Sequence, residues 1–216
     1  MLSLEDARDR LLAAVRPVIE TETVPLWDGL DRILAELLRA PRAVPPADNS
    51  AMDGYALRSA DWPLADGGLA LAGTATAGAP FKGALPAGHC VRIMTGALIP
   101  ADCDAVIMQE ACELSGQGRT TRVRPPRPPR PGENIRRAGE DIAVGAGLLS
   151  AGRRLRPSDL GLLASLGLSA VEVLRRPRVA LLSTGSELRE PGEPLAEGQI
   201  YDSNRYLLTA MLRRLD

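Results

Sequence analysis

Four short polar clusters in this 216-residue chain carry the side chains that could do chemistry. The first is "DNSAMDGYA" at 48–56, where Asp53 precedes a glycine and a strand-like "YAL", so that a sharp turn would present its carboxylate. The second is "RIMTG", where Thr95 and Gly96 end a strand and would expose a hydroxyl and a backbone N–H. A carboxylate can hold a hard cation, whereas hydroxyl and amide hydrogens can hold an anion.

The other two clusters combine charge with small residues. "GENIRRAGED" is a loop rich in glycine, and its charged side chains include Arg136, Arg137, Glu140 and Asp141. "STGSEL" follows a predicted parallel strand, and its small residues would let a phosphate-bearing ligand approach the backbone. These small residues are Ser183, Thr184, Gly185 and Ser186. Glu187 beside them could hold a hard cation.

Each cluster also has a purely structural interpretation. Asp53 with Gly54 can be an ordinary turn, and Thr95 with Gly96 is a common turn pair. The charged loop can be a solvated charge network. "STGSEL" is neither a P-loop nor a GxGxxG fingerprint. Taken together, however, the clusters offer oxygen ligands for a divalent metal and arginines and hydroxyls for an anion. That combination suits a phosphate-bearing substrate.

Helical spacing of apolar residues predicts two helices near the N-terminus that precede these clusters. The first begins at Ser3, with Asp6 three residues later, and Pro17 limits it. The second covers "WDGLDRILAELL" at 27–38 and is ended by "APRAVPP".

Residues 48–139 have a different sequence pattern, in which short apolar runs alternate with glycine and proline. This pattern predicts a small β-rich domain, a barrel or a sandwich. Within it, "RPPRPPRPG" at 124–132 contains the PxxP pattern of SH3 ligands, but a stiff surface connection between strands is the favoured interpretation.

The C-terminal part predicts mixed α/β structure. "RPSDLGLLASLGL" indicates a helix capped near Ser158 and stopped at Gly167, followed by a short strand, "AVEVL". "RVALLS" at 178–183 is typical of a strand buried on both faces of a parallel sheet. The last helix would begin at Asp202 or Ser203.

Composition excludes several classes of function. The formal net charge is -1 and only 3% of residues are aromatic, so neither a basic surface nor stacking platforms favour nucleic-acid binding. No signal peptide and no apolar run long enough to span a bilayer are recognisable, which predicts a cytoplasmic protein without membrane contact. Cys90, Cys103 and Cys112 do not suggest disulfides. His89 beside Cys90 is interpreted as a packed strand residue, with half a metal site as the alternative.

Long blocks of the sequence resemble the molybdopterin molybdenumtransferases, the MoeA and gephyrin E-domain family. The blocks are "DNSAMDGYALR", "AGAPFKGALPAGHCVRIMTGALIPADCDAVIMQE", "PGENIRRAGEDIAVGAGLLSAGRRLRPSDLGLLASLGL" and "PRVALLSTGSEL" with "GQIYDSNRYLL". They cover nearly the whole chain in the family's order.

The resemblance implies an α+β multidomain fold in an elongated homodimer. In it, a β-rich, barrel- or sandwich-like domain is inserted in an elongated α/β linker domain, and the start of a molybdopterin-binding α/β domain follows. The implied divisions are an N-terminal helix at 1–24, a linker and dimerisation domain at 25–45 and 140–176, the β-rich domain at 46–139, and the α/β start at 177–216.

The resemblance also implies an activity, namely insertion of molybdenum into adenylylated molybdopterin with release of AMP. Mg²⁺ would be the cofactor, molybdate and adenylylated molybdopterin the substrates, and molybdopterin adenylyltransferase the upstream partner. Asp53, Asp141 and Glu187 would be catalytic and would position magnesium and an attacking water. Arg136 and Thr95 would hold phosphate or molybdate oxygens. Ser183, Thr184 and Gly185 would line the substrate on the α/β side.

Two departures from the family bear on activity. Ser186 stands where many relatives carry an acid, and the family's later Gly-Gly-x-Ser-x-Gly stretch is absent. We therefore expect a truncated chain that is inactive alone. The alternative is a non-catalytic fragment that dimerises or serves as a scaffold.

Overall fold

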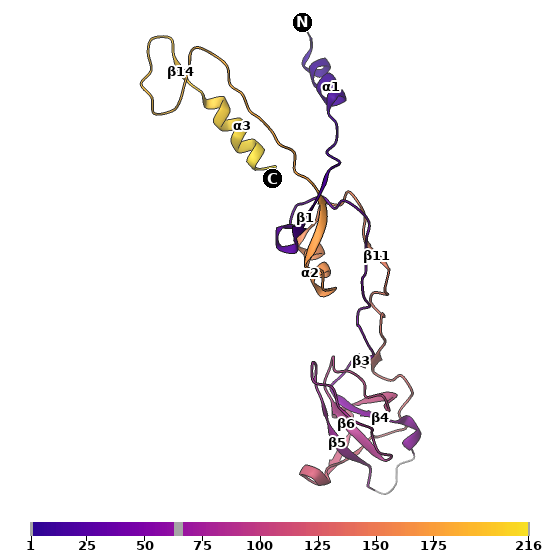
Figure 1. Cartoon of the computed structure of the whole chain (residues 1–216). Helices are drawn as coiled ribbons and strands as arrows, with labels where there is room; N and C mark the ends of the chain where they lie inside the picture. The colour runs from indigo at the N-terminus through magenta and orange to yellow at the C-terminus, as the bar shows by residue number, and fades with distance from the viewer. Residues whose placement is uncertain (1, 63–66, 216) are drawn as a thin grey trace. The chain divides into compact units, whose positions relative to one another are not determined.

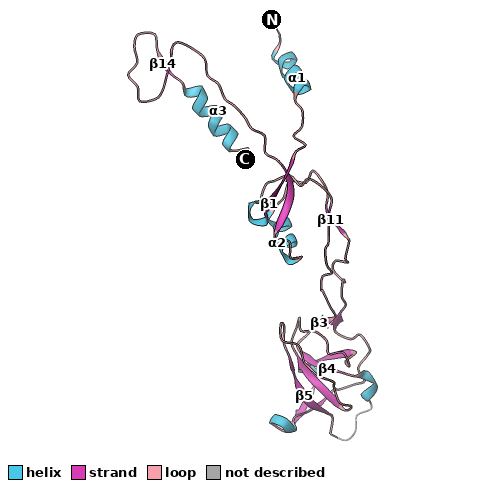
Figure 2. Ribbon diagram, viewed as in Figure 1, coloured by secondary structure: helices cyan, strands magenta, loops and turns pink. Residues whose placement is uncertain are grey.

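A computed structural model describes residues 2–62 and 67–215. Its internal contacts divide the chain into two units, one formed by Met1–Leu37 with Leu149–Asp216 and the other by Leu38–Leu148. The four-part domain division expected from the resemblance stays a prediction. Figures 1 and 2 show the elements of both units.

The unit Leu38–Leu148 is built on one six-stranded sheet (Figure 1). Its strand order is β7-β4-β6-β5-β9-β8, with β5 and β6 parallel and the other neighbours antiparallel. The strands are β4 (Gly54–Leu57), β5 (Leu69–Ala75), β6 (His89–Ile93), β7 (Ala105–Met108), β8 (Glu113–Ser115) and β9 (Arg122–Arg124). The prediction of a β-rich segment is confirmed, and its architecture is one curled sheet within a fold of mixed α and β content.

Both faces of this sheet are packed, which explains the short apolar runs. Because side chains alternate along a strand, Val91 and Val106 enter one buried cluster while Cys90 and Ile107 enter the other. Burial raises the pKa of the Cys90 thiol to about 12. All three cysteines are free, so the expectation of no disulfide is confirmed. His89 opens β6, as the strand interpretation predicted.

The proline-rich stretch connects β9 to the short strand β10 (Ile135–Arg136). Pro125 and Pro129 are buried, while Pro126 and Pro128 are exposed. Arg127 pairs with Glu133 within the same segment. The stretch is thus fixed to its own unit, in agreement with the interpretation as a stiff connection.

Shorter elements complete this unit. They are β2 (Leu38–Arg39), β3 (Asn49–Ser50) and β11 (Gly147–Leu149), and the single 3₁₀ turns η2 (Ser59–Asp61), η3 (Gln109–Ala111) and η4 (Gly118–Thr120). β2 and β11 stand where the chain enters and leaves the unit.

The core of the other unit is an antiparallel pair of strands with a short helix (Figure 2). β1 (Thr21–Pro25) pairs with β12 (Ala170–Leu174), and α2 spans Pro157–Ser165. The predicted helix and strand are confirmed here, with two differences at the helix start. α2 begins after Arg156, and its first turn is capped by Asp159, whose carboxylate accepts the Arg156 N–H at 2.9 Å. Gly167 follows the helix with φ +80°, as a stop signal requires.

The predicted helix over 27–38 is wrong. This segment forms a 3₁₀ turn, η1 (Leu26–Asp28), a second turn at Leu30 and Asp31, and then β-bridges at Ile33 and Leu34. Asp31 has φ +61°, which a helix does not allow, and Leu34 donates its N–H to the Arg153 carbonyl. Leu34 is 1% exposed beside Val173. Pairing with a distant segment therefore overrides a helical spacing of leucines.

The predicted buried strand at 178–183 is also wrong. These residues have no regular structure, and Leu182 is 87% exposed. A strand of a parallel sheet needs a neighbour on at least one edge, and among the described residues none pairs with this segment. The nearest regular structure is the small parallel pair of β13 (Leu188–Arg189) and β14 (Ile200–Tyr201).

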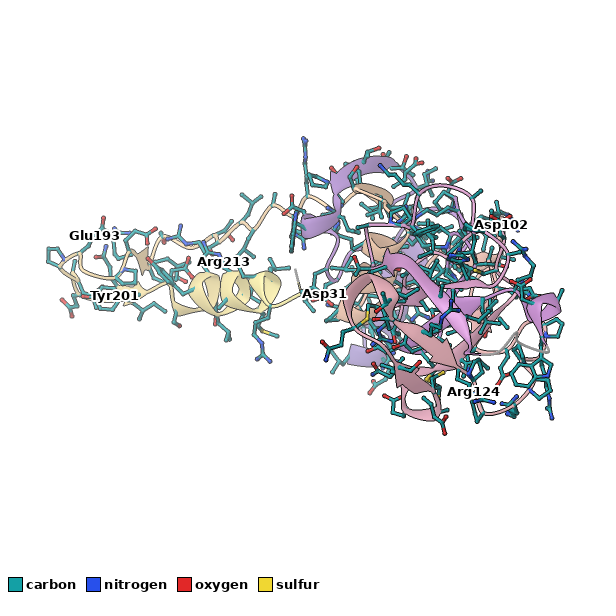
Figure 3. All side chains as sticks on the ribbon, turned by 90° about the horizontal axis from the view of Figure 1, so that it is seen from below. Asp31, Asp102, Arg124, Glu193, Tyr201 and Arg213 are labelled. Atoms are coloured by element: carbon teal, nitrogen blue, oxygen red, sulfur yellow. The ribbon has the colours of Figure 1, made fainter. Side chains whose placement is uncertain are left out.

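The two terminal helices form where they were predicted. α1 (Leu4–Ala14) begins at Ser3, whose hydroxyl accepts the Asp6 N–H, and ends before Pro17. α3 (Ser203–Arg213) begins at Asp202, whose carboxylate accepts the Arg205 N–H. Before α3, the Tyr201 hydroxyl donates to the Glu193 carbonyl at 2.9 Å, and Figure 3 shows both side chains.

None of the helices within residues 2–62 and 67–215 combines the length and apolar character that crossing a bilayer requires.

Candidate functional site

The short strand β3 organises the polar clusters of the unit Leu38–Leu148. On one edge its Ser50 exchanges hydrogen bonds with the turn that contains Gly96 and Ala97. On the other edge Ser50 pairs with Ile135 of β10. The "MTG" and "GENIRRAGED" clusters therefore flank the "DNSAMDG" cluster, one on each side. These three predicted clusters are brought together.

Gly54 allows the close approach that fixes the backbone beside Asp53. A Cβ on Gly54 would lie 2.1 Å from the carbonyl oxygen of Ile107, far inside contact distance. The Gln109 N–H donates to the Asp53 carbonyl at 3.1 Å on the same side. The glycine is thus needed for packing of β4 against β7, because its φ is not in the left-handed region that a sharp Asp-Gly turn would use.

The Asp53 carboxylate is held against Thr95. Its Oδ1 accepts the Thr95 backbone N–H at 2.7 Å and the Thr95 hydroxyl at 2.8 Å. These hydrogen bonds, the backbone bond first, lower the pKa of Asp53 from its usual value. Asp53 is therefore an ionised carboxylate at neutral pH, with one of its oxygens already bound.

The Thr95-Gly96 turn does not expose a backbone N–H, contrary to the prediction from sequence. Thr95 donates its N–H to Asp53, and Gly96 donates its N–H to the Ser50 carbonyl at 2.8 Å. Ala97 closes the turn by donating to Met94 at 3.0 Å, and Gly96 has φ +80° as a type II turn requires. What the turn presents is the Thr95 hydroxyl on an exposed residue.

The charged loop is a network of paired groups. Arg136 Nη2 lies 2.5 Å from both carboxylate oxygens of Asp141. This contact raises the pKa of Arg136. Glu140 accepts the backbone N–H of Arg137 at 2.9 Å. Both members of the Arg136–Asp141 pair are about half exposed, with side-chain accessibilities of 40% and 47%, so a ligand can compete for either.

Asp48 is a residue of the site that the sequence did not single out. Its carboxylate accepts Arg137 Nη1 at 2.5 Å and the Ala138 N–H at 2.9 Å. These contacts, the Ala138 bond first, lower the pKa of Asp48. Asp48 thereby ties the start of "DNSAMDG" to the charged loop, 89 residues away. Its only sequence signal was its place in that motif.

Arg92 is a second such residue, and it contacts Gly54, the residue that follows Asp53. It donates Nη1 to the Gly54 carbonyl at 2.9 Å, bonds to the Gln109 side-chain oxygen and stacks on the Tyr55 ring at 5.2 Å. Its charge contributes to the lowered pKa of Asp53. In the sequence it was one polar residue in an apolar strand, which gave no functional signal.

The "STGSEL" cluster belongs to the other unit. Ser183, Thr184 and Gly185 are exposed and irregular. The carboxylate of Glu187 folds back over Gly185, so that a Cβ there would lie 2.7 Å from both of its oxygens. Within residues 2–62 and 67–215, no group of three His, Cys, Asp or Glu side chains is arranged to hold a metal ion.

Comparisons with known proteins agree on one family. The family model described as the MoeA N-terminal region (domain I and II) matches residues 2–167. A molybdopterin molybdenumtransferase from Haemophilus influenzae is 45% identical over 215 residues, covering 100% of this chain and 52% of the relative. The molybdopterin molybdenumtransferase 2 of Mycobacterium tuberculosis is 41% identical over 207 residues, covering 94% and 49%.

A solved structure, the molybdopterin biosynthesis MoeA protein from Pyrococcus horikosii, superposes with a TM-score of 0.81 at 35% identity. The alignment covers 100% of this chain and 55% of that one. The chain spans about half the length of the curated relatives it matches. Matches of this extent leave one conclusion: the chain belongs to the MoeA family, whose curated members are named molybdopterin molybdenumtransferases, enzymes of molybdenum cofactor biosynthesis.

Proposed function

We propose that this chain supplies the β-rich side of the site at which molybdenum is inserted into adenylylated molybdopterin, with release of AMP. The observation that carries the proposal is the arrangement around β3. One short strand brings an ionised, hydroxyl-bound carboxylate and an exchangeable arginine–carboxylate pair to adjoining segments. The arginine of this pair, Arg136, would bind molybdate or the phosphate of adenylylated molybdopterin.

Arg136 is the proposed anion-binding residue. A guanidinium has five N–H donors in a planar fork, and in Arg136 one terminal nitrogen contacts Asp141. A molybdate or phosphate oxygen competes with Asp141 for this group, since charge-assisted hydrogen bonds to such oxygens are strong. Binding of the anion would thereby release the Asp141 carboxylate.

Magnesium is the proposed cofactor, and its fit can be judged from the ligand set. Carboxylate oxygens are the right ligands for it, but the described residues contain no group of three. Asp53 and Asp141 are moreover bound to Thr95 and Arg136. The described residues of one chain therefore do not form a magnesium cage on their own.

The proposal extends to a homodimer. In it, Asp53, Thr95, Arg136 and Asp141 of one subunit would face a cleft completed by a second subunit. Glu187 and the small residues of the second subunit would complete the metal and substrate contacts. These small residues are Ser183, Thr184 and Gly185. Glu187 lies in the unit Met1–Leu37 with Leu149–Asp216, whereas the other carboxylates lie in the unit Leu38–Leu148. Molybdopterin adenylyltransferase is the proposed upstream partner and the cytoplasm the proposed location.

The proposal is tested by substitution in a chain extended to the length of its relatives. Asp53→Ala and Asp141→Ala should each lower molybdate-dependent AMP release by at least tenfold, which is about 1.4 kcal/mol of transition-state stabilisation. Their melting temperatures should stay within a few degrees, because both carboxylates lie in partly or fully exposed loops.

Asp9→Ala is the matched control, since its ion pair with Arg8 is exposed on α1. It should leave AMP release unchanged. Normal turnover in both site variants would contradict the assignment, because AMP release would then depend on neither carboxylate.

A further inference from the structure

The side chains of Asp53 and Thr95 can only accept hydrogen bonds from a ligand. The Thr95 hydroxyl carries one hydrogen, and it donates that hydrogen to Asp53 Oδ1 at 2.8 Å. The direction follows from the partner, because an ionised carboxylate has no hydrogen to donate. The side-chain oxygens of Thr95 and Asp53 therefore offer a ligand only lone pairs, which accept hydrogen bonds.

The backbone around Thr95 adds no donor to this surface. The N–H groups of Thr95, Gly96 and Ala97 are donated to Asp53, Ser50 and Met94. Three successive amides are therefore already used within the protein. This turn is unlike the loops that bind phosphate, which aim free N–H groups at the anion.

Beside Asp53, the Arg92 guanidinium is bonded to the Gly54 carbonyl and to the Gln109 side chain. The guanidinium groups of Arg136 and Arg137 lie in the charged loop, on the other edge of β3. In the charged loop, too, the backbone N–H groups are used internally: Arg137 donates to Glu140, and Ala138 donates to Asp48. The side chains of Arg136 and Arg137 are 40% and 60% exposed. An oxyanion that reaches this side of the site meets arginine.

Resting on the proposed function, we propose that the two sides of β3 bind groups of opposite hydrogen-bonding polarity. The Asp53–Thr95 surface takes a hydrogen-bond donor, either an N–H group of the ligand's ring system or the water of a hydrated divalent cation. The Arg136 guanidinium takes the oxyanion. Thr95 is then a specificity residue for a donor group and does not hold a phosphate or molybdate oxygen.

This assignment is tested by NMR titration of the 216-residue chain with three separate probes. The probes are molybdate alone, magnesium chloride alone, and a pterin that carries ring N–H and amino donors. The reporters are the Thr95 methyl and amide signals and the Arg136 Nε–H signal. Molybdate should shift the Arg136 signal and leave Thr95 unshifted. The pterin or magnesium should shift Thr95, and whichever does so identifies the source of the donor.

Two variants sharpen the result. Asp53→Asn keeps an acceptor oxygen for the Thr95 amide but adds two N–H donors, so molybdate should now shift the Thr95 signals, which it leaves unshifted in the parent chain. Thr95→Ser keeps the hydroxyl but removes the methyl reporter, and the amide signal at position 95 should respond to the three probes as it does in the parent chain.

Two outcomes overturn the inference. One is a Thr95 shift with molybdate in the parent chain that matches the Arg136 shift in its concentration dependence. The other is the absence of any Thr95 shift with the pterin and with magnesium. Because no turnover is measured, both outcomes are distinguishable from failure of the proposed catalytic function, which AMP release tests.

Discussion

At the scale of single residues, the site depends on what lies beneath it as much as on the side chains it presents. Asp53 reaches Thr95 only because β4 runs directly against the Ile107 carbonyl, where Gly54 leaves room. Arg92 then bonds the Gly54 carbonyl from the other side. A carboxylate held in this way keeps its place without being buried.

Substitution of Gly54 tests this dependence. Gly54→Ala would place a Cβ 2.1 Å from a backbone oxygen, which no side-chain movement can relieve. We expect a loss of about 3 kcal/mol in the free energy of unfolding, measured in urea.

Gly161→Ala is the control, because it makes the same chemical change in α2 with no atom within 4 Å of the new Cβ. It should raise stability by about 0.5–1 kcal/mol, since glycine is unfavourable inside a helix. Equal effects of the two substitutions would show that the close approach at Gly54 is not what stabilises the strand pair.

At the scale of elements, α2 is fixed by a buried carboxylate. Asp159 is 4% exposed, accepts the Arg156 N–H at the helix start and binds Arg153 through both oxygens, at 3.0 and 2.9 Å. The side-chain bond to Arg153 is the main reason that the pKa of Asp159 lies below its usual value of 3.8. The cap and the ion pair thus depend on one ionised group.

Asp159→Ala should therefore cost about 2 kcal/mol of unfolding free energy, from loss of a helix cap and of charge-assisted hydrogen bonds. The pH dependence follows from the sign of the shift. A lowered pKa contributes stability that is complete above 3.8 and is lost as pH falls through 3.8 toward the folded-state value.

Urea unfolding between pH 6 and pH 2.5 measures this. Asp159→Asn, which keeps an acceptor for the Arg156 N–H, should lose less stability at pH 6 than Asp159→Ala. Both variants should show a weaker acid dependence than the parent chain. An unchanged acid dependence would assign it to other carboxylates.

Hydrogen exchange should separate the six-stranded sheet from the segment at 178–187. Val91 lies in β6, which is paired on both edges, and Val106, in the edge strand β7, donates its N–H to the Glu133 carbonyl at 2.9 Å; both residues are buried, so these two amides should exchange slowest. The amides of Val179 and Leu182, in exposed irregular backbone, should exchange at nearly unprotected rates. Strong protection at 178–183 would indicate a strand partner that the described residues do not contain.

At the scale of the whole molecule, the two terminal helices, α1 and α3, each carry exposed apolar side chains. On α1, Leu11 is 70% exposed, and Leu4 and Leu12 are also exposed. On α3, Leu207 and Met211 are exposed as well. Contiguous apolar surface of this kind marks interaction sites.

We expect the chain to be at least partly dimeric at tens of micromolar, as the proposed homodimer requires. Sedimentation equilibrium measures this. Leu11→Asp should shift the equilibrium toward monomer if α1 contributes to the contact, whereas Arg10→Asp, on the opposite face of the same helix, should have little effect. A monomer across that concentration range would contradict the proposed assembly.

The sequence alone determined the local structure wherever neighbours in the chain supply the partners. The starts of α1 and α3 follow from Ser3 and Asp202, whose acceptors lie three residues before the N–H groups that they cap. The β-rich character of 48–139 likewise followed from alternating apolar residues and turns. The family was also evident from sequence, because its motifs are long and ordered.

Only the tertiary structure decided the rest, because the partners are distant in sequence. The segment at 27–38 became extended through hydrogen bonds to residues more than a hundred positions away, such as Arg153. The Thr95 hydroxyl is a donor to the protein because the carboxylate of Asp53, 42 residues earlier, accepts its hydrogen. Asp48 and Arg92 entered the site in the same way. Propensity and spacing describe what a segment prefers in isolation, whereas the polarity of a site depends on which distant donor meets which acceptor.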